Sequence, residues 1–196
     1  LIIIPARKNS KRLPNKNLKL IKNKTLVERA IEFGLKIGKN ENIFVSTDSL
    51  KIKEIAQKYK IICPSLRSRK LSSDKSTMAE VCIDVIKKYE KITNNKIQFV
   101  ILLQPTSPFR SIGIFKKSLK LFLKNQKPTF TVSEFIKLEF KHLVIQKKNK
   151  TLKIMKNIPN YFFTNGNIYI ISRIDLLRNK NFFKKTFNQV VIKSKK

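Results

Sequence analysis

The sequence has little of the material from which many enzyme sites are built. Among its 196 residues there are one histidine, His142, and two cysteines, Cys63 and Cys82. The sequence therefore has too few of these residues for histidine-rich zinc sites, Ser-His-Asp triads or disulfide frameworks. Cys82 falls at helical spacing among apolar residues, which favours a buried structural thiol over a catalytic one. We expect both cysteines to stay reduced, in a cytoplasmic protein.

Glycine, proline and long apolar runs are also scarce. Four glycines and seven prolines beside 41% hydrophobic residues exclude collagen-like, low-complexity and wholly disordered chains. The longest apolar runs, residues 1–4 and 99–103, fall far below the roughly 20 residues that span a bilayer. We therefore expect no membrane segment and one ordinary domain over residues 1–196.

Acidic residues are few: 12 stand against 44 basic ones, which gives a net charge of +32. Such a charge suggests nucleic acid as a partner. However, 36 of the basic residues are lysine and only 8 are arginine, and the lysines are scattered through every expected helix and loop. Base reading and bidentate phosphate contacts favour arginine. We therefore interpret most lysines as solvated surface residues and expect no specific nucleic-acid partner. A basic nucleic-acid-binding module is the alternative.

Short β-branched runs alternate with amphipathic helical windows, which predicts an α/β sandwich around a mainly parallel sheet. We expect strands at residues 1–4, 43–45, 61–63, 99–103, 129–132, 167–171 and 189–193. Helices are expected at 25–37, 50–59, from about 76 to 89, 112–125 and 174–177. The strand at 99–103 is the most apolar and should be central. Residues 134–163 break the pattern, and their β-like runs at 142–146 and 151–155 predict a hairpin outside the sheet.

The polar loop that follows the first strand concentrates groups suited to a polyphosphate. Open α/β sheets bind ligands beyond the carboxyl ends of their strands. The loop holds no glycine and is not a Walker loop, yet it brings four cations, a hydroxyl and an amide together, on Arg7, Lys11, Arg12, Lys16, Ser10 and Asn17. Each charge-assisted contact there would contribute on the order of 1.5–3 kcal/mol. By composition alone a solvated basic loop is an equal alternative.

Four ordered motifs cover nearly the whole chain. The first loop fits a pattern of Ile-Pro-Ala-Arg, Ser-Lys, Pro and Lys-Asn at Ile4, Pro5, Ala6, Arg7, Ser10, Lys11, Pro14, Lys16 and Asn17. The others are Val45–Asp48, Leu102–Pro108 with Arg110, and Asn165–Gly166 with Ile168–Ile170. This set resembles the acylneuraminate cytidylyltransferase family, the CMP-sialate synthetases and their legionaminate and pseudaminate relatives.

The resemblance implies a three-layer α/β/α Rossmann-like nucleotidyltransferase fold with a mainly parallel mixed sheet. It also implies a reaction in which the anomeric hydroxyl of a nine-carbon ulosonic acid attacks the α-phosphate of CTP and releases pyrophosphate. Phosphoryl-type transfer requires mainly positioning and cations around developing negative charge, which the first loop supplies. A 3-deoxy-manno-octulosonate cytidylyltransferase and a non-catalytic homologue are alternatives.

Site residues follow from the resemblance position by position. Lys16 and Arg7 are the expected catalytic residues, and triphosphate contacts fall to Arg7, Ser10, Lys11 and Lys16. Asn17 would face the nucleoside, Arg67 the base, and Ser76 would line the nucleotide pocket. Acceptor contacts fall to Gln104, Thr106, Ser107, Phe162 and Phe163. For Ser107, capping the helix that starts near Ser111 is an equal alternative.

Further expectations concern metal and assembly. Asp48 is interpreted as a helix cap rather than a metal ligand, and Asp74 or Ser76 as the cap of the helix that ends near Tyr89. The family's Asp-x-Asp pair would hold Mg²⁺, and we expect it beyond Lys196, in a protein truncated at both ends. Residues 134–163 are expected to form a homodimer contact. Met155–Pro159 stand where relatives commonly read Arg-Gln, which leaves the identity of the sugar open.

Overall fold

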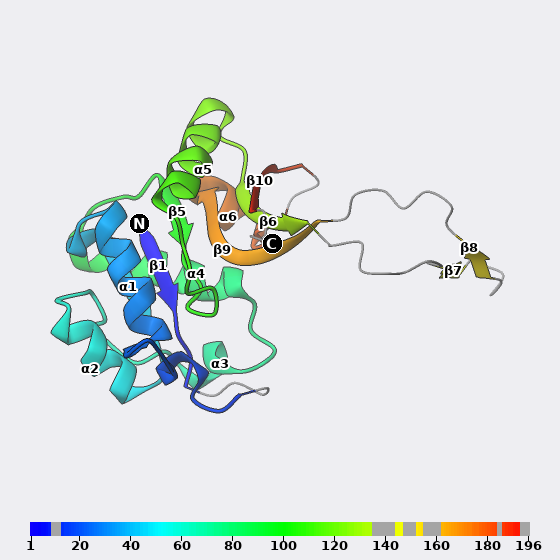
Figure 1. Ribbon diagram of the computed structural model, residues 1–196. Coiled ribbons are helices and arrows are strands. Elements are labelled where there is room, and N and C mark those ends of the chain that lie inside the picture. The colour runs from blue at the N-terminus through cyan, green and yellow to red at the C-terminus, as the bar shows by residue number, and fades with distance from the viewer. Residues whose placement is uncertain (9–12, 135–143, 147–151, 155–161, 184–185, 193–196) are drawn as a thin grey trace.

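A six-stranded sheet forms the middle layer of the computed structural model (Figure 1). The structure describes residues 1–8, 13–134, 144–146, 152–154, 162–183 and 186–192. From edge to edge the strands are β10 (Asn188–Ile192), β6 (Thr129–Glu134), β9 (Phe162–Ser172), β5 (Phe99–Leu102), β1 (Ile2–Pro5) and β4 (Ile43–Ser46). Every pair of neighbours is parallel except those that include β9, which is antiparallel to both β5 and β6. The mainly parallel mixed sheet and the central place of β5 are thus confirmed.

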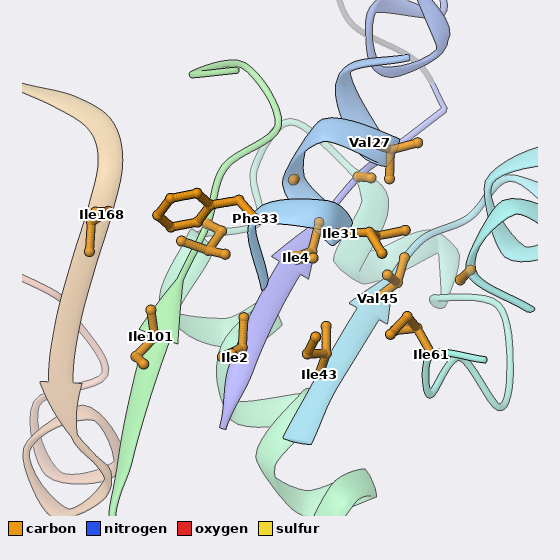
Figure 2. Close-up of a cluster of buried hydrophobic side chains, with 14 of the residues drawn as sticks. Ile2, Ile4, Val27, Ile31, Phe33, Ile43, Val45, Ile61, Ile101 and Ile168 are labelled. Carbon is orange, nitrogen blue, oxygen red and sulfur yellow. The ribbon is translucent and has the colours of Figure 1, made fainter. Parts of the chain in front are cut away.

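Three helices cover one face of the sheet: α1 (Leu26–Ile37), α2 (Leu50–Lys58) and α5 (Ile112–Asn125). Figure 2 shows this core, in which Val27, Ile31 and Phe33 of α1 lie over alternate residues of the strands. The strand residues on this face include Ile2, Ile4, Ile43, Val45, Ile101 and Ile168. Because side chains alternate along a strand, the residues between them face the other way.

Two helices cover the opposite face: α4 (Met78–Thr93) and α6 (Arg173–Asn179). Their apolar residues pack on the alternate set of strand side chains, which includes Ile3, Phe44, Val100, Leu102 and Tyr169. Cys82 of α4 is fully buried in this layer and carries no disulfide, as the helical spacing indicates. The two helical layers around the sheet confirm the three-layer α/β/α fold.

Capping residues fix where two of the helices begin. Thr25 caps α1 through a capping box in which its hydroxyl accepts from the Glu28 amide and the Glu28 carboxylate accepts from the Thr25 amide. Thr77 and Glu80 form the same box at α4. The prediction that Asp74 or Ser76 caps α4 is therefore wrong, since the reciprocal pair satisfies two amides where a lone Asp or Ser satisfies one.

Several short elements lie within the segments that the sequence left as loops. They are η1 (Lys16–Leu18), β2 (Leu20–Ile21), β3 (Lys24–Thr25), η2 (Asn40–Asn42) and α3 (Arg69–Ser72). Lys22 and Asn23 join β2 to β3 with positive φ angles of 47° and 62°, the backbone of a two-residue hairpin turn. The strand expected at 61–63 is wrong: one bridge, from Ile62 to Phe44, is all that forms there among the described residues. Pro64, which lacks an amide hydrogen, follows directly.

The segment 134–163 contains a separate two-stranded antiparallel sheet, β7 (Val144–Gln146) and β8 (Leu152–Ile154), which lies apart from the main sheet in Figure 1. The expected pairing of the two β-like runs is confirmed, while the rest of both runs, with His142, lies outside the described residues. β9 begins five residues earlier than expected, at Phe162, because Phe162 and Phe163 pair with Glu134 and Ser133 of β6. No helix in the described part of the chain is long and apolar enough to span a membrane.

Candidate functional site

A cavity of about 150 Å³ opens at the carboxyl ends of β1 and β5. It is lined by Pro5, Arg7, Lys16, Asn17, Arg67, Met78, Gln104, Pro105 and Thr106. The chain leaves β1 toward β4 on one side and returns to β5 on the other, so the cavity lies where the strand order reverses. In open α/β sheets this is the usual place for a ligand.

The loop after β1 reaches the cavity because its backbone is anchored at both ends. At its start, the Ala6 amide donates to the Ser46 carbonyl of β4 over 2.9 Å. Near its end, Asn15 adopts a left-handed conformation with φ 51°, which Asn tolerates well. The side-chain Nδ2 of the buried Asn17 then donates to the Arg7 carbonyl over 2.8 Å. This bond closes the loop on itself and holds Arg7 and Lys16 beside the same cavity.

Arg7 is held by an acidic side chain that does not itself line the cavity. Its Nη1 lies 2.8 Å from Oδ1 of Asp74, which follows α3. Both side chains are more than one third exposed, so the pair stabilises the fold only weakly. Because the contact uses Nη1, the rest of the guanidinium remains available to an anion in the cavity.

Arg67 reaches the cavity from the loop between α2 and α3 and is buried, with 8% of its surface exposed. Its amide donates to the Thr47 carbonyl over 2.6 Å and its Nη2 to the Ser46 carbonyl, which fixes it against the end of β4. Its Nε is buried without a hydrogen-bond partner among the described residues. Burial lowers the pKa of Arg67, and the nearby Asp48 acts in the opposite direction. A buried guanidinium with an unused donor is suited to a polar ligand such as a nucleobase.

The electrostatic character of the cavity is cationic. Three cations line it, Arg7, Lys16 and Arg67, and none of the described lining residues is acidic. Asp48 stands at the carboxyl end of β4 and accepts the Lys8 amide at 2.6 Å. The prediction that Asp48 caps α2 is thus wrong: Ser49 is the cap residue, and the carboxylate instead holds the first turn of the loop after β1. The cavity can hold a polyphosphate and neutralise charge that develops on it.

Residues after β5 form the other wall. Gln104, Pro105 and Thr106 line the cavity, and the Gln104 carbonyl accepts the Ser107 amide at 3.0 Å. The Ser107 hydroxyl donates to the Asn165 carbonyl over 2.7 Å. It therefore does not cap the following helix, whose cap residue is Ser111. It joins the loop after β5 to the Asn165–Gly166 turn in β9 instead.

Six of the twelve predicted site residues come together in the cavity wall: Arg7, Lys16, Asn17, Arg67, Gln104 and Thr106. Ser10 and Lys11 lie outside the described residues. Ser76 is not in the wall; its hydroxyl donates to the Lys70 carbonyl and contacts Ser73. Phe162 and Phe163 are 38% and 51% exposed at the start of β9 and do not line the cavity.

Sequence reasoning missed three members of the wall, Pro5, Met78 and Pro105. Pro5 and Pro105 belong to two of the quoted motifs, so their place in the motifs was a usable signal. Met78 offered none, because at helical spacing an apolar residue reads as core. It is the first residue of α4, and the position of that helix turns it toward the cavity.

Mg²⁺ is the ion that the family resemblance implies. Mg²⁺ at a nucleotide is held by one or two carboxylates together with phosphate oxygens. Asp48 is bonded to the Lys8 amide and Asp74 to Arg7. Within the described part of the chain there is also no group of three His, Cys, Asp or Glu side chains that could hold a metal.

The fold and the cavity define an α/β protein of the nucleotidyltransferase class, with a cationic site at the topological switch point. A family model described as cytidylyltransferase matches residues 1–192. The chain belongs to this cytidylyltransferase family.

Individual relatives agree with this assignment. The chain is 32% identical to a CMP-N,N'-diacetyllegionaminic acid synthase of Legionella pneumophila, over 99% of this chain and 87% of that protein. It is 34% identical to a pseudaminic acid cytidylyltransferase of Campylobacter jejuni, over 69% of this chain and 58% of that protein. Among solved structures, a CMP:2-keto-3-deoxy-manno-octonic acid synthetase complexed with CTP matches with a TM-score of 0.70. That match covers 99% of this chain and 90% of the other at 17% identity, which supports the fold alone.

Proposed function

We propose that this protein transfers CMP from CTP to the anomeric hydroxyl of a nine-carbon ulosonic acid and releases pyrophosphate. One observation carries the proposal: the cations Arg7, Lys16 and Arg67 line the same cavity as Gln104, at the reversal of the strand order. The cationic part suits a nucleoside triphosphate, and the neutral hydrogen-bonding part suits a polyhydroxylated acceptor. The two relatives described above carry the names of enzymes for this class of product.

In the proposed reaction the anomeric hydroxyl gives up its proton to water as its oxygen bonds to the α-phosphorus, and the bond from that phosphorus to the bridging oxygen of pyrophosphate breaks. Negative charge then builds on the phosphate oxygens and on the leaving group. Lys16 stabilises the charge at the α-phosphate, and Arg7 that of the leaving pyrophosphate. Arg67 offers its unused Nε to the base, and Asn17 holds the loop that carries both cations. Gln104 binds the acceptor sugar, with Thr106 beside it.

The acceptor decides between this function and its nearest alternative, a 3-deoxy-manno-octulosonate cytidylyltransferase. The solved structure named for that sugar supports the fold, whereas the more similar sequences are named for legionaminic and pseudaminic acids. The test supplies the full natural protein with CTP, Mg²⁺ and legionaminic, pseudaminic, N-acetylneuraminic or 3-deoxy-manno-octulosonic acid, and measures pyrophosphate and the CMP-sugar. Product from a nine-carbon acid supports the proposal. Product from the eight-carbon acid alone establishes the alternative, and no product with any acid indicates a non-catalytic homologue.

Magnesium is proposed to accompany the triphosphate, where it would neutralise the phosphate oxygens. The described residues hold no group of three candidate metal ligands, and no step above is assigned to the ion. Loss of pyrophosphate release on chelation with EDTA, and its recovery with added Mg²⁺, would support the requirement.

We further propose a homodimer that forms through residues 134–163. A lone two-stranded sheet such as β7 with β8 is marginally stable in water, so it gains from a second surface. Phe162 and Phe163 are exposed beside it in sequence and would add apolar area to the contact. Light scattering should give a dimer mass at tens of micromolar protein, an ordinary range for homodimers. A monomer mass there would contradict the proposal.

The use of CTP is the reason to place the protein in the cytoplasm, where that nucleotide is made. Its net charge of +32 will attract polyanions at low salt without making nucleic acid a specific partner. A nucleic-acid-binding module would instead show salt-resistant, sequence-dependent affinity. Fluorescence anisotropy with labelled oligonucleotides at increasing salt distinguishes the two.

A further inference from the structure

Arg110 occupies an unusual position behind the acceptor side of the cavity. It is not among the residues that line the cavity, yet its guanidinium contacts the backbone of Gln104, which does line it, and that of Asn167 in β9. Nε donates to the Asn167 carbonyl over 2.8 Å, and Nη2 donates to the Gln104 carbonyl. One rigid side chain thus ties the loop after β5 to β9, two segments more than fifty residues apart in sequence.

The environment of Arg110 makes this position costly to maintain. Burial lowers its pKa to about 10, and no carboxylate of the described residues forms an ion pair with it. Its charge is balanced by carbonyl oxygens and by the ring of Phe33, whose centroid lies 5.8 Å from the guanidinium carbon. Nη1 is buried without a partner among the described residues. A buried guanidinium with an unused donor is expected where the residue holds neighbouring segments in place rather than adding to the stability of the fold.

The turn that Arg110 holds lies directly against Gln104. An ideal Cβ placed on Gly166 would lie 3.3 Å from Oε1 of Gln104 and 3.3 Å from the Ser107 hydroxyl, so the Gln104 amide packs against the glycine. Around the turn, Asn165 accepts from Thr131 and donates to Ser133. The turn is thereby fixed to β6 on one side. On the other side Arg110, Ser107 and the Asn167 side chain, which donates to the Phe109 carbonyl over 2.7 Å, fix it to the segment after β5.

We propose that Arg110 is a positioning residue for the acceptor sugar: by joining the Gln104 and Asn167 carbonyls it holds the Gln104 amide at the place where the sugar binds. The inference rests on the proposed function, in which Gln104 contacts the acceptor. It assigns Arg110 no contact with the sugar or with CTP. Misplacement of a binding group by about 1 Å can cost on the order of 10²-fold in rate.

The direct test is Arg110→Gln in the full natural protein, with the KM values for sugar and for CTP measured separately. We expect the KM for the sugar to rise by roughly tenfold to a hundredfold and the KM for CTP to stay within about twofold. Arg110→Lys keeps the charge but not the planar fork, so it should restore little of the loss. Arg29→Gln is the matched control, because Arg29 also donates Nε and Nη2 to a backbone carbonyl, that of Ile21, and does not line the cavity that holds Gln104.

A double substitution separates positioning from a general structural role. If Arg110 acts through Gln104, the pair Arg110→Gln with Gln104→Ala should lose no more sugar affinity than Gln104→Ala alone. Losses that multiply, an equal loss of CTP affinity, or an unchanged KM for the sugar would each overturn the proposal. Should Arg110→Gln fail to fold, as judged by thermal melting, Arg110→Lys and Ser107→Ala are judged by the same criteria. A wild-type protein that makes no CMP-sugar would refute the proposed function instead, so the two failures are distinguishable.

Discussion

Replacement of Gly166 by alanine tests the acceptor side of the site most directly. Gly166 has a φ of +70°, a conformation that costs a residue with a Cβ roughly 1–2 kcal/mol. The new Cβ would also lie 3.3 Å from both Gln104 Oε1 and the Ser107 hydroxyl, closer than ordinary van der Waals contact. Both neighbours are ends of side chains and can give way by a few tenths of an ångström. The loss of stability therefore comes from the backbone conformation at position 166, and the Gln104 side chain is displaced.

The expected loss is about 1–2 kcal/mol in the free energy of unfolding. In a domain of this size each kcal/mol lowers Tm by roughly 2–4 °C, so Tm should fall by roughly 2–8 °C in differential scanning calorimetry. The KM for the acceptor sugar should rise because Gln104 moves, while the KM for CTP should not. Alanine in place of Gly113 is the control: it lies in α5, meets nothing closer than 3.6 Å, and should stabilise by up to about 1 kcal/mol. An alanine at 166 that leaves both Tm and the sugar KM unchanged would refute the reasoning.

Three further predictions concern the nucleotide side and the core. CTP should raise Tm more than ATP, GTP or UTP at equal concentration, since a ligand at 100 times its Kd stabilises by about 2.7 kcal/mol; equal shifts would reduce the site to a general polyanion site. Lys16→Ala should lower turnover by roughly 10²–10³-fold, whereas Lys127→Ala, at an exposed lysine, should have little effect. Unchanged turnover in Lys16→Ala would contradict the role assigned to Lys16. Cys82 is fully buried, and burial raises the pKa of its thiol to about 12. At pH 8 the thiol is therefore protonated and should react with a thiol reagent only when the fold opens. Rapid labelling of the native protein would contradict the place of Cys82 in the core.

Elements with a strong local signal could be predicted from the sequence. The apolar positions of α1 repeat at helical spacing and Thr25 stands at its start, so the element forms within one residue of the expected bounds. Of the candidate site, the part carried by motifs at the ends of β1 and β5 is also where expected. Both results rest on local patterns, which a sequence displays directly.

What the sequence could not provide depends on contacts between distant segments. Asp48 and Asp74 each looked like a helix cap, because a short acidic side chain before a helical window has that role most often. In the fold the first instead meets the Lys8 amide and the second meets Arg7, partners 40 and 67 residues away. The direction of β9 was equally hidden, since a β-branched run does not specify whether its neighbours are parallel or antiparallel.

The direction of β9 brings its turn to the Gln104 side of the cavity. Parallel strands bring their carboxyl ends to one edge, so β1 and β5 deliver the cationic loop and Gln104 there. β9 runs the opposite way: Tyr169 pairs with Leu102, and the residues that precede Tyr169 therefore reach that same edge. Between Phe130–Tyr169 and Val132–Thr164 the register with β6 shifts, which leaves room for the turn at Gly166. β9, antiparallel to both of its neighbours in the main sheet, thus carries its turn to Gln104, where Arg110, Ser107 and Asn167 hold it.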